Sequence, residues 1–198
     1  MTSFRSEPFL WVHLAGIVVA PFAFLVVWLA LAISVPLTPY WLELVFLVGI
    51  GVLPILWMQW HKPFEIFSLL VVALRPEVLT LEQRKILSLF KQPRQRILTI
   101  LTALLMTVKL LALYYFAPLA SLPVLDFPQI RIAALGVAAI AFFIANLFVQ
   151  VPVSVLGILL TSNSTYEQIN PIELSDIPQK LTLFGFRVKK ISLIPQGS

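Results

Sequence analysis

The sequence contains no cysteine, two histidines and few charged residues, and each shortage excludes a class of site. Without cysteine there is no disulfide and no thiolate metal centre, and two histidines leave little for a histidine-rich one. Charged residues make up 12% of the 198 residues, against about 25% in soluble domains, while 60% of the residues are hydrophobic. This composition predicts an integral membrane protein.

Familiar catalytic motifs are also missing. The sequence has no H-E-x-x-H, no G-x-S-x-G and no P-loop, and eight of its nine acidic residues lie outside the apolar runs. The exception is Glu43. We therefore expect a protein that is not an enzyme, with no metal site and no nucleic acid as a partner.

Four apolar runs are long enough to cross a bilayer, which takes about 20 helical residues. They predict membrane-spanning helices over residues 9–33, 40–60, 97–116 and 132–160. Pro8 suits the first turn of the first helix, and Pro21 predicts a kink within it. The fold class is therefore all-α, with residues 1–160 as a four-helix transmembrane domain.

Basic residues are distributed very unequally among the connections. The segment from His61 to Arg96 carries seven, the residues before the first span one and the residues after the fourth span four, whereas the two remaining connections together carry only Arg131. Because cytoplasmic loops are enriched in lysine and arginine, this predicts cytoplasmic termini and a cytoplasmic central loop. Only an even number of spans permits that arrangement.

The segment "PFEIFSLLVVALRP", from Pro63 to Pro76, is apolar but too short to span. A helix over residues 63–75 would place its few polar side chains on one narrow edge. Such a helix must rest in the bilayer interface, re-enter the membrane partway or be covered by protein. We predict an interfacial helix with a docking surface, made of Phe64, Phe67, Leu70, Val71 and Leu74.

A second short interfacial helix, amphipathic and basic, is predicted over residues 80–91. Thr80 and Gln83 form a capping box, and Ile86, Leu87 and Phe90 share one face. Residues 161–198 form a cytoplasmic tail that is first polar and loop-like. The stretch "KLTLFGFRVKKISLI" then predicts a β-hairpin around Gly185, which we expect to lean on the cytoplasmic helices.

Polar residues within the spans are functional candidates because burying them in a bilayer is costly. Lys109 and Glu43 lie at similar depth, so a structural ion pair between them, or a snorkelling lysine, is the simplest interpretation. Asn146 and Gln150 share a helix face and could hold helices together or bind a pigment, lipid headgroup or ion. Together with Lys109 and Glu43 they could also mark a water-lined pocket, but a pore would need more polar positions than these four spans supply.

The two histidines, His13 and His61, lie at the same side of the predicted membrane. Each could ligate a haem or a chlorophyll, although a histidine near an interface is more often hydrogen-bonded to a neighbour. Chlorophyll or carotenoid is therefore considered as a cofactor, and none is certain.

Three stretches resemble a cyanobacterial family of low-complexity tail membrane proteins. They are "FRSEPFLWVHLAG" from Phe4, "LWMQWHKPFEIFSLLVVALRPEVLTLEQRKILSLFK" from Leu56 and "NLFVQVPVSV" from Asn146. The tail after Leu160 departs from the family's label because it is short and not of low complexity. The resemblance implies a photosynthetic prokaryote and the thylakoid membrane, but it transfers no activity or residue role.

These observations predict an accessory or assembly protein of a membrane complex, most simply a photosystem in the thylakoid membrane. Its partners would be photosystem subunits and the lipid bilayer. The alternative is a small transporter or lipid-handling protein that uses Lys109, Asn146 and Gln150. Substitution of Lys109 by methionine separates the two, since only transport should require its charge.

Overall fold

The computed structural model describes residues 4–69, 71–120 and 128–191. It is mostly helical with a small three-stranded sheet, and four of its helices are long and apolar enough to cross a membrane. These candidate spans are Pro8–Ala32, Trp41–His61, Pro93–Ala120 and Gln129–Leu159. The four predicted spans are thus confirmed, and the third extends beyond residues 97–116 at both ends.

Prolines interrupt the first two spans. The first span consists of α1 (Pro8–Ala15), the 3-10 turn η2 (Gly16–Val18) and α2 (Val19–Ala32). Proline removes a backbone donor and its ring clashes with the carbonyl four residues earlier, so the distortion expected from Pro21 falls within η2. The second span is likewise divided into α3 (Trp41–Gly51) and α4 (Leu53–His61), next to Pro54.

The chain forms two compact units, and each unit draws on separate stretches of the sequence. Unit 1 comprises Met1–Ala15, Met58–Thr99 and Val151–Ser198, and unit 2 comprises Gly16–Trp57 and Ile100–Gln150. The tail therefore belongs to a unit that also contains the first residues and the central loop.

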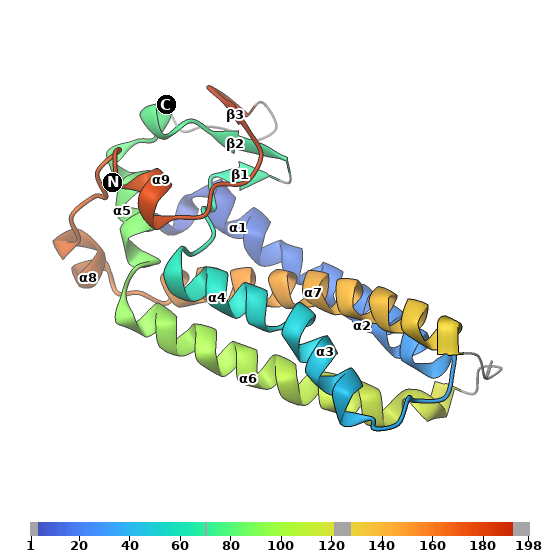
Figure 1. Ribbon diagram of the computed structural model, residues 1–198. Coiled ribbons are helices and arrows are strands. Elements are labelled where there is room, and N and C mark those ends of the chain that lie inside the picture. Colours follow the sequence, from blue (N-terminus) through green and yellow to red (C-terminus); the bar gives the residue numbers. More distant parts are fainter. Residues whose placement is uncertain (1–3, 70, 121–127, 192–198) are drawn as a thin grey trace. The chain divides into compact units, whose positions relative to one another are not determined.

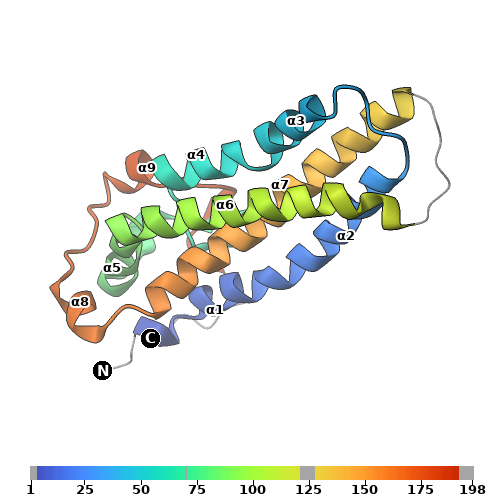
Figure 2. The ribbon, with the colours of Figure 1, turned by 90° about the horizontal axis from the view of Figure 1, so that it is seen from below.

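Unit 2 is a bundle of helices with a continuous apolar core. In both views α2, α3, α6 (Pro93–Phe116) and α7 (Pro128–Leu159) run side by side (Figures 1 and 2). The buried face of α7 is rich in alanine, and small side chains let helices approach closely. A methyl group added to Gly51 would lie 2.7 Å from Cδ1 of Phe142, so α3 and α7 meet closely at this glycine.

Unit 1 joins the ends of the spans to the segments that connect them. Arg5 donates to the carbonyl of Leu159 at 2.9 Å, and the backbone nitrogen of Thr182 donates to the carbonyl of Pro63 at 3.0 Å. The residues before the first span, the central loop and the tail therefore lie together. This agrees with the even number of spans, which places these three segments on one side of the membrane.

The predicted helix over residues 80–91 is present as α5 (Leu81–Leu89). The hydroxyl of Thr80 accepts from the backbone nitrogen of Gln83 at 3.2 Å, and the Gln83 side chain accepts from the nitrogen of Thr80, so the capping box is confirmed. The shared face with Ile86 and Leu87 is buried in the core of unit 1. The apolar face of α5 therefore packs against other residues of the same chain.

The predicted helix over residues 63–75 is wrong. The segment contains two short antiparallel strands, β1 (Ser68–Leu69) and β2 (Val72–Leu74). Before β1, Glu65 accepts from the nitrogen of Phe67 at 2.9 Å, and its carbonyl accepts from the hydroxyl of Ser68 at 2.9 Å. These local bonds satisfy the backbone in a turn and compete with helix formation.

The predicted hairpin in the tail is also wrong. The tail has one strand in its described part, β3 (Phe186–Val188), which pairs in parallel with β2 and gives the order β1-β2-β3. Gly185, at φ 101°, separates this pairing from a bridge between Thr182 and Phe64. A side chain at Gly185 would lie 2.4 Å from the backbone of Val71, so only glycine permits this approach.

Two short helices occupy the part of the tail predicted to be loop. They are α8 (Asn163–Gln168) and α9 (Ile177–Lys180). The hydroxyl of Ser162 caps α8 by accepting from the nitrogen of Thr165 at 3.2 Å. Ser162 could therefore have predicted the start of α8, although the polar composition of the segment indicated a loop.

Candidate functional site

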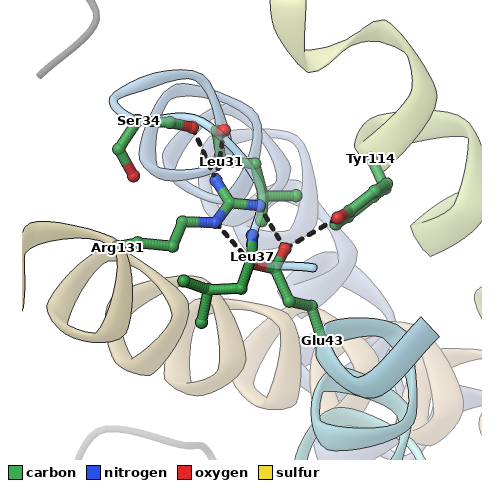
Figure 3. A network of polar contacts seen from close by, with 6 residues as sticks. All are labelled: Leu31, Ser34, Leu37, Glu43, Tyr114 and Arg131. Carbon is green, nitrogen blue, oxygen red and sulfur yellow. Dashed lines mark hydrogen bonds and ion pairs between the residues drawn. The ribbon is translucent and has the colours of Figure 1, made fainter. Parts of the chain in front are cut away.

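A buried network of polar contacts surrounds Arg131 in unit 2 (Figure 3). Arg131 in the first turn of α7 is 1% exposed, and Glu43 in the first turn of α3 is 3% exposed. The guanidinium Nε of Arg131 donates to Oε1 of Glu43 at 2.8 Å, and its Nη2 forms an ion pair with Oε2. The network also includes Tyr114 and three backbone groups, and we call it the Arg131 clamp.

The backbone groups of the clamp belong to the end of α2 and the residues after it. Nη1 of Arg131 donates to the carbonyl oxygens of Leu31 at 2.8 Å and Ser34 at 3.1 Å. Glu43 accepts from the backbone nitrogen of Leu37 and from the hydroxyl of Tyr114 in α6, each at 2.7 Å. The clamp therefore ties α2, α3, α6 and α7 together.

The clamp leaves little capacity for a ligand. Each oxygen of Glu43 accepts two hydrogen bonds, which fills the roughly four acceptor sites of a carboxylate. All three guanidinium nitrogens of Arg131 also donate. This arrangement favours a structural role for Glu43.

Of the two interpretations of Lys109, the ion pair with Glu43 is wrong, and the snorkelling lysine stays a prediction. Lys109 is exposed on α6, and its Nζ lies 5.4 Å from the centroid of the Phe24 ring. The partner that α6 supplies to Glu43 is Tyr114, and the cation comes from α7. Equal depth therefore did not mean contact, because the two residues face different directions on their helices.

Sequence reasoning missed Arg131 by counting it as part of a loop. A usable signal was present, since Arg131 precedes a series of buried residues at helical spacing in α7. This series consists of Ala134, Leu135, Ala138, Phe142 and Ala145. Extending this apolar face by one turn toward the start of α7 places Arg131 on it. An arginine on a buried helix face needs an acidic or carbonyl partner, so the spacing could have predicted that Arg131 is buried and paired.

Asn146 and Gln150 are buried on α7, as their shared face predicts. Nδ2 of Asn146 donates to the carbonyl of Gly51 in α3 at 2.9 Å, which is the interhelical contact expected of packing. Its Oδ1 and both amide atoms of Gln150 have no hydrogen-bond partner among the described residues. Buried amides are usually satisfied. In the described part of unit 2, these three atoms and the hydroxyl of Ser34 are the buried side-chain atoms without a hydrogen-bond partner.

The two histidines have different surroundings. Nδ1 of His13 lies 2.9 Å from the carbonyl of Phe9, and its ring centroid is 5.8 Å from that of Phe64. This is the ordinary hydrogen bond to a neighbour that the sequence suggests. His61 ends α4 with an exposed side chain. The described residues include no group of three or more metal-ligating side chains. Pigment ligation stays a prediction for both.

Part of the predicted docking surface is buried by this chain. Phe67 and Leu74 are 0% and 3% exposed and belong to the core of unit 1, and Phe64 is half-buried. Val71 is 56% exposed, and Leu70 lies outside the described residues. The buried part of the segment is thus covered by protein, one of the three options for an apolar peptide, and the covering protein is the chain itself.

Glu65 is a buried titratable residue that sequence reasoning passed over. It is 1% exposed, and its Oε2 has no hydrogen-bond partner among the residues described. Burial raises the pKa of Glu65 to about 7, although the nitrogen of Phe67 and the charge of Arg187 favour the carboxylate. Its protonation therefore changes close to neutral pH.

The four candidate spans and the Arg131 clamp define the chain as an integral membrane protein with a helical bundle. Residues 6–193 match the model of the family described as low-complexity tail membrane protein-like, and the chain belongs to this family. Comparison with curated proteins and with solved structures gives no match. The resemblance noted in the sequence is thus confirmed at the level of the family.

Proposed function

We propose that this chain is a non-catalytic accessory or assembly protein of a larger membrane complex. The Arg131 clamp carries the proposal, because its two buried charges bind each other and the backbone of neighbouring helices. Charges used in this way hold neighbouring helices in place and leave little binding capacity for a substrate. A bundle held in this way suits a protein that holds other components.

The outward surface of the spans supports the same proposal. Within the most apolar window of each span, between 28% and 44% of the residues are buried inside the protein. More than half of the residues in each window are therefore at least partly exposed, and lipid or the helices of a partner can cover them. This surface takes the place of the segment over residues 63–75 as the proposed site of docking.

The proposed complex is a photosystem in the thylakoid membrane, with both termini in the cytoplasm. The membrane and partner are supported by the resemblance to a cyanobacterial family at residues 4–16, 56–91 and 146–155. The orientation is supported by the twelve basic residues before, between and after the spans on one side, against Arg131 alone on the other.

Co-purification in mild detergent tests the proposal. We expect the tagged chain to migrate on native gels with photosystem subunits, and migration as a free monomer at every growth stage would contradict it. Arg131→Met should weaken co-purification at equal membrane abundance because it breaks the clamp, while Lys109→Met should not. An absorption spectrum of the eluate without chlorophyll, carotenoid or haem would contradict pigment ligation by His13.

A small transporter or lipid-handling protein is the second candidate. The observation that favours it is the set of three unsatisfied amide atoms on Asn146 and Gln150. Under this candidate, Gln150→Met and Lys109→Met both abolish uptake or lipid transfer in reconstituted vesicles. Under the accessory proposal, Lys109→Met has mild effects because its exposed side chain contacts only an aromatic ring among the interactions described.

A further inference from the structure

The small sheet in unit 1 carries exposed apolar side chains at one end, and two exposed lysines follow β3 at the other end. Phe186 at the start of β3 is 79% exposed, Phe184 is 59% exposed and Val71 is 56% exposed. Lys189 and Lys190 follow directly after β3, and both are exposed. We call these five residues the β3 surface.

The backbone holds the apolar part of this surface together. The nitrogen of Phe186 donates to the carbonyl of Val71 at 2.6 Å, and Phe186 is in register with Val72. The close approach of Gly185 to the backbone of Val71 brings Phe184 to the same end of the sheet. The aromatic side chains are therefore presented on a paired strand, close to Val71.

The β3 surface lies close to the end of a membrane span. Thr182 is hydrogen-bonded to the carbonyl oxygens of Lys62 and Pro63, which follow the last residue of α4. Phe184 is two residues further along, so its backbone is within about 7 Å of Thr182.

We propose that the β3 surface inserts into the headgroup layer of the bilayer that the chain itself spans. Phe184, Phe186 and Val71 enter the boundary between headgroups and acyl chains, while Lys189 and Lys190 bind the phosphates of anionic lipids. Apolar side chains combined with lysines are the composition that binds anionic membrane interfaces. Because the β3 surface lies near the end of a span, it stays close to the membrane.

The occupant proposed here is lipid, for two reasons of chemistry. The two lysines complement an anionic leaflet, and the surface begins two residues after Thr182, which is hydrogen-bonded to the residues that directly follow a span. The inference is independent of the accessory function, because it concerns the purified chain in a bilayer with no partner present. A protein that covers the surface instead is an outcome of the test.

The absence of cysteine allows a direct measurement. Phe186→Cys is labelled with the fluorophore NBD, and the chain is placed in nanodiscs of phosphatidylcholine with phosphatidylglycerol. Glu77→Cys is the matched control, because Glu77 is exposed in η3 (Pro76–Val78) beyond the opposite end of β2 in the same unit. Both variants must retain the thermal unfolding of the parent chain, which we expect because both side chains are exposed.

The proposal predicts blue-shifted NBD emission at position 186 and its loss when brominated phosphatidylcholine is included, with neither effect at position 77. Combining Phe186→Cys with Lys189→Gln and Lys190→Gln should reduce the difference between anionic and neutral nanodiscs. Water-exposed emission at position 186 overturns the proposal. Shielded emission that brominated lipid does not quench also overturns it, since protein would then cover the surface.

Discussion

The Arg131 clamp can be tested by removing its positive charge. In Arg131→Met, Glu43 stays buried at 3% exposure and keeps only the bonds from Leu37 and Tyr114. The carbonyl oxygens of Leu31 and Ser34 lose their donor at the same time. Removing one member of a buried ion pair costs about 3–5 kcal/mol because the other charge is left uncompensated. We expect a loss of stability in this range.

The double variant Arg131→Met with Glu43→Gln separates the pair from its surroundings. Because neither charge then remains, its loss of stability should be smaller than the sum of the two single losses. Contacting residues in one network usually show coupling of about 0.5–3 kcal/mol. Coupling at the upper end of this range is expected, since Glu43 and Arg131 share two contacts.

Reversible unfolding in mixed micelles, followed by the fluorescence of the five tryptophans, provides the assay. Lys109→Met is the matched control because it also replaces a basic residue of the spans with methionine. Its exposed contact with Phe24 predicts a loss of about 0.5–1 kcal/mol. An Arg131→Met loss no larger than that of Lys109→Met, or strictly additive single effects, would refute the reasoning.

Three further predictions test other parts of the structure. Gly51→Ala should lower the free energy of unfolding by about 1–3 kcal/mol because the added methyl group forces Phe142 aside. Gly49→Ala meets no neighbour within 4 Å and should stabilise α3 by up to about 1 kcal/mol. Thermal unfolding of the two variants compares these effects. Burial raises the pKa of Glu65 from 4.5 to about 7, so the folded chain binds a proton that the unfolded chain releases. The contribution of Glu65 to stability should therefore be greatest below pH 4.5 and fall by about 3 kcal/mol as pH rises to 7, and Glu65→Gln should remove this part of the pH dependence in melting curves. Gln150→Met should be neutral or stabilise the chain by about 1–3 kcal/mol in the same unfolding assay, because it removes two unsatisfied buried amide atoms; a clear loss would indicate a polar molecule bound there.

The sequence by itself determined the features that depend on local composition. Length and hydropathy predicted four spans, because a helix must be apolar over about 20 residues to cross the bilayer. The Thr80 capping box and the apolar face of α5 could also be predicted, because they depend on residues three or four positions apart in the sequence. The burial of Asn146 and Gln150 also followed from helical spacing.

Only the tertiary structure decided the contacts between distant segments. Depth alone would allow Glu43 to pair with any cation at the same level of the membrane. The rotation of each helix about its axis places Arg131 and Tyr114 against Glu43 and leaves Lys109 exposed. The segment after Pro63 has the composition of a short helix, yet it pairs with a strand more than a hundred residues away. Hydropathy and periodicity describe neighbours in the chain, whereas strand register and helix rotation depend on the packing of the whole unit.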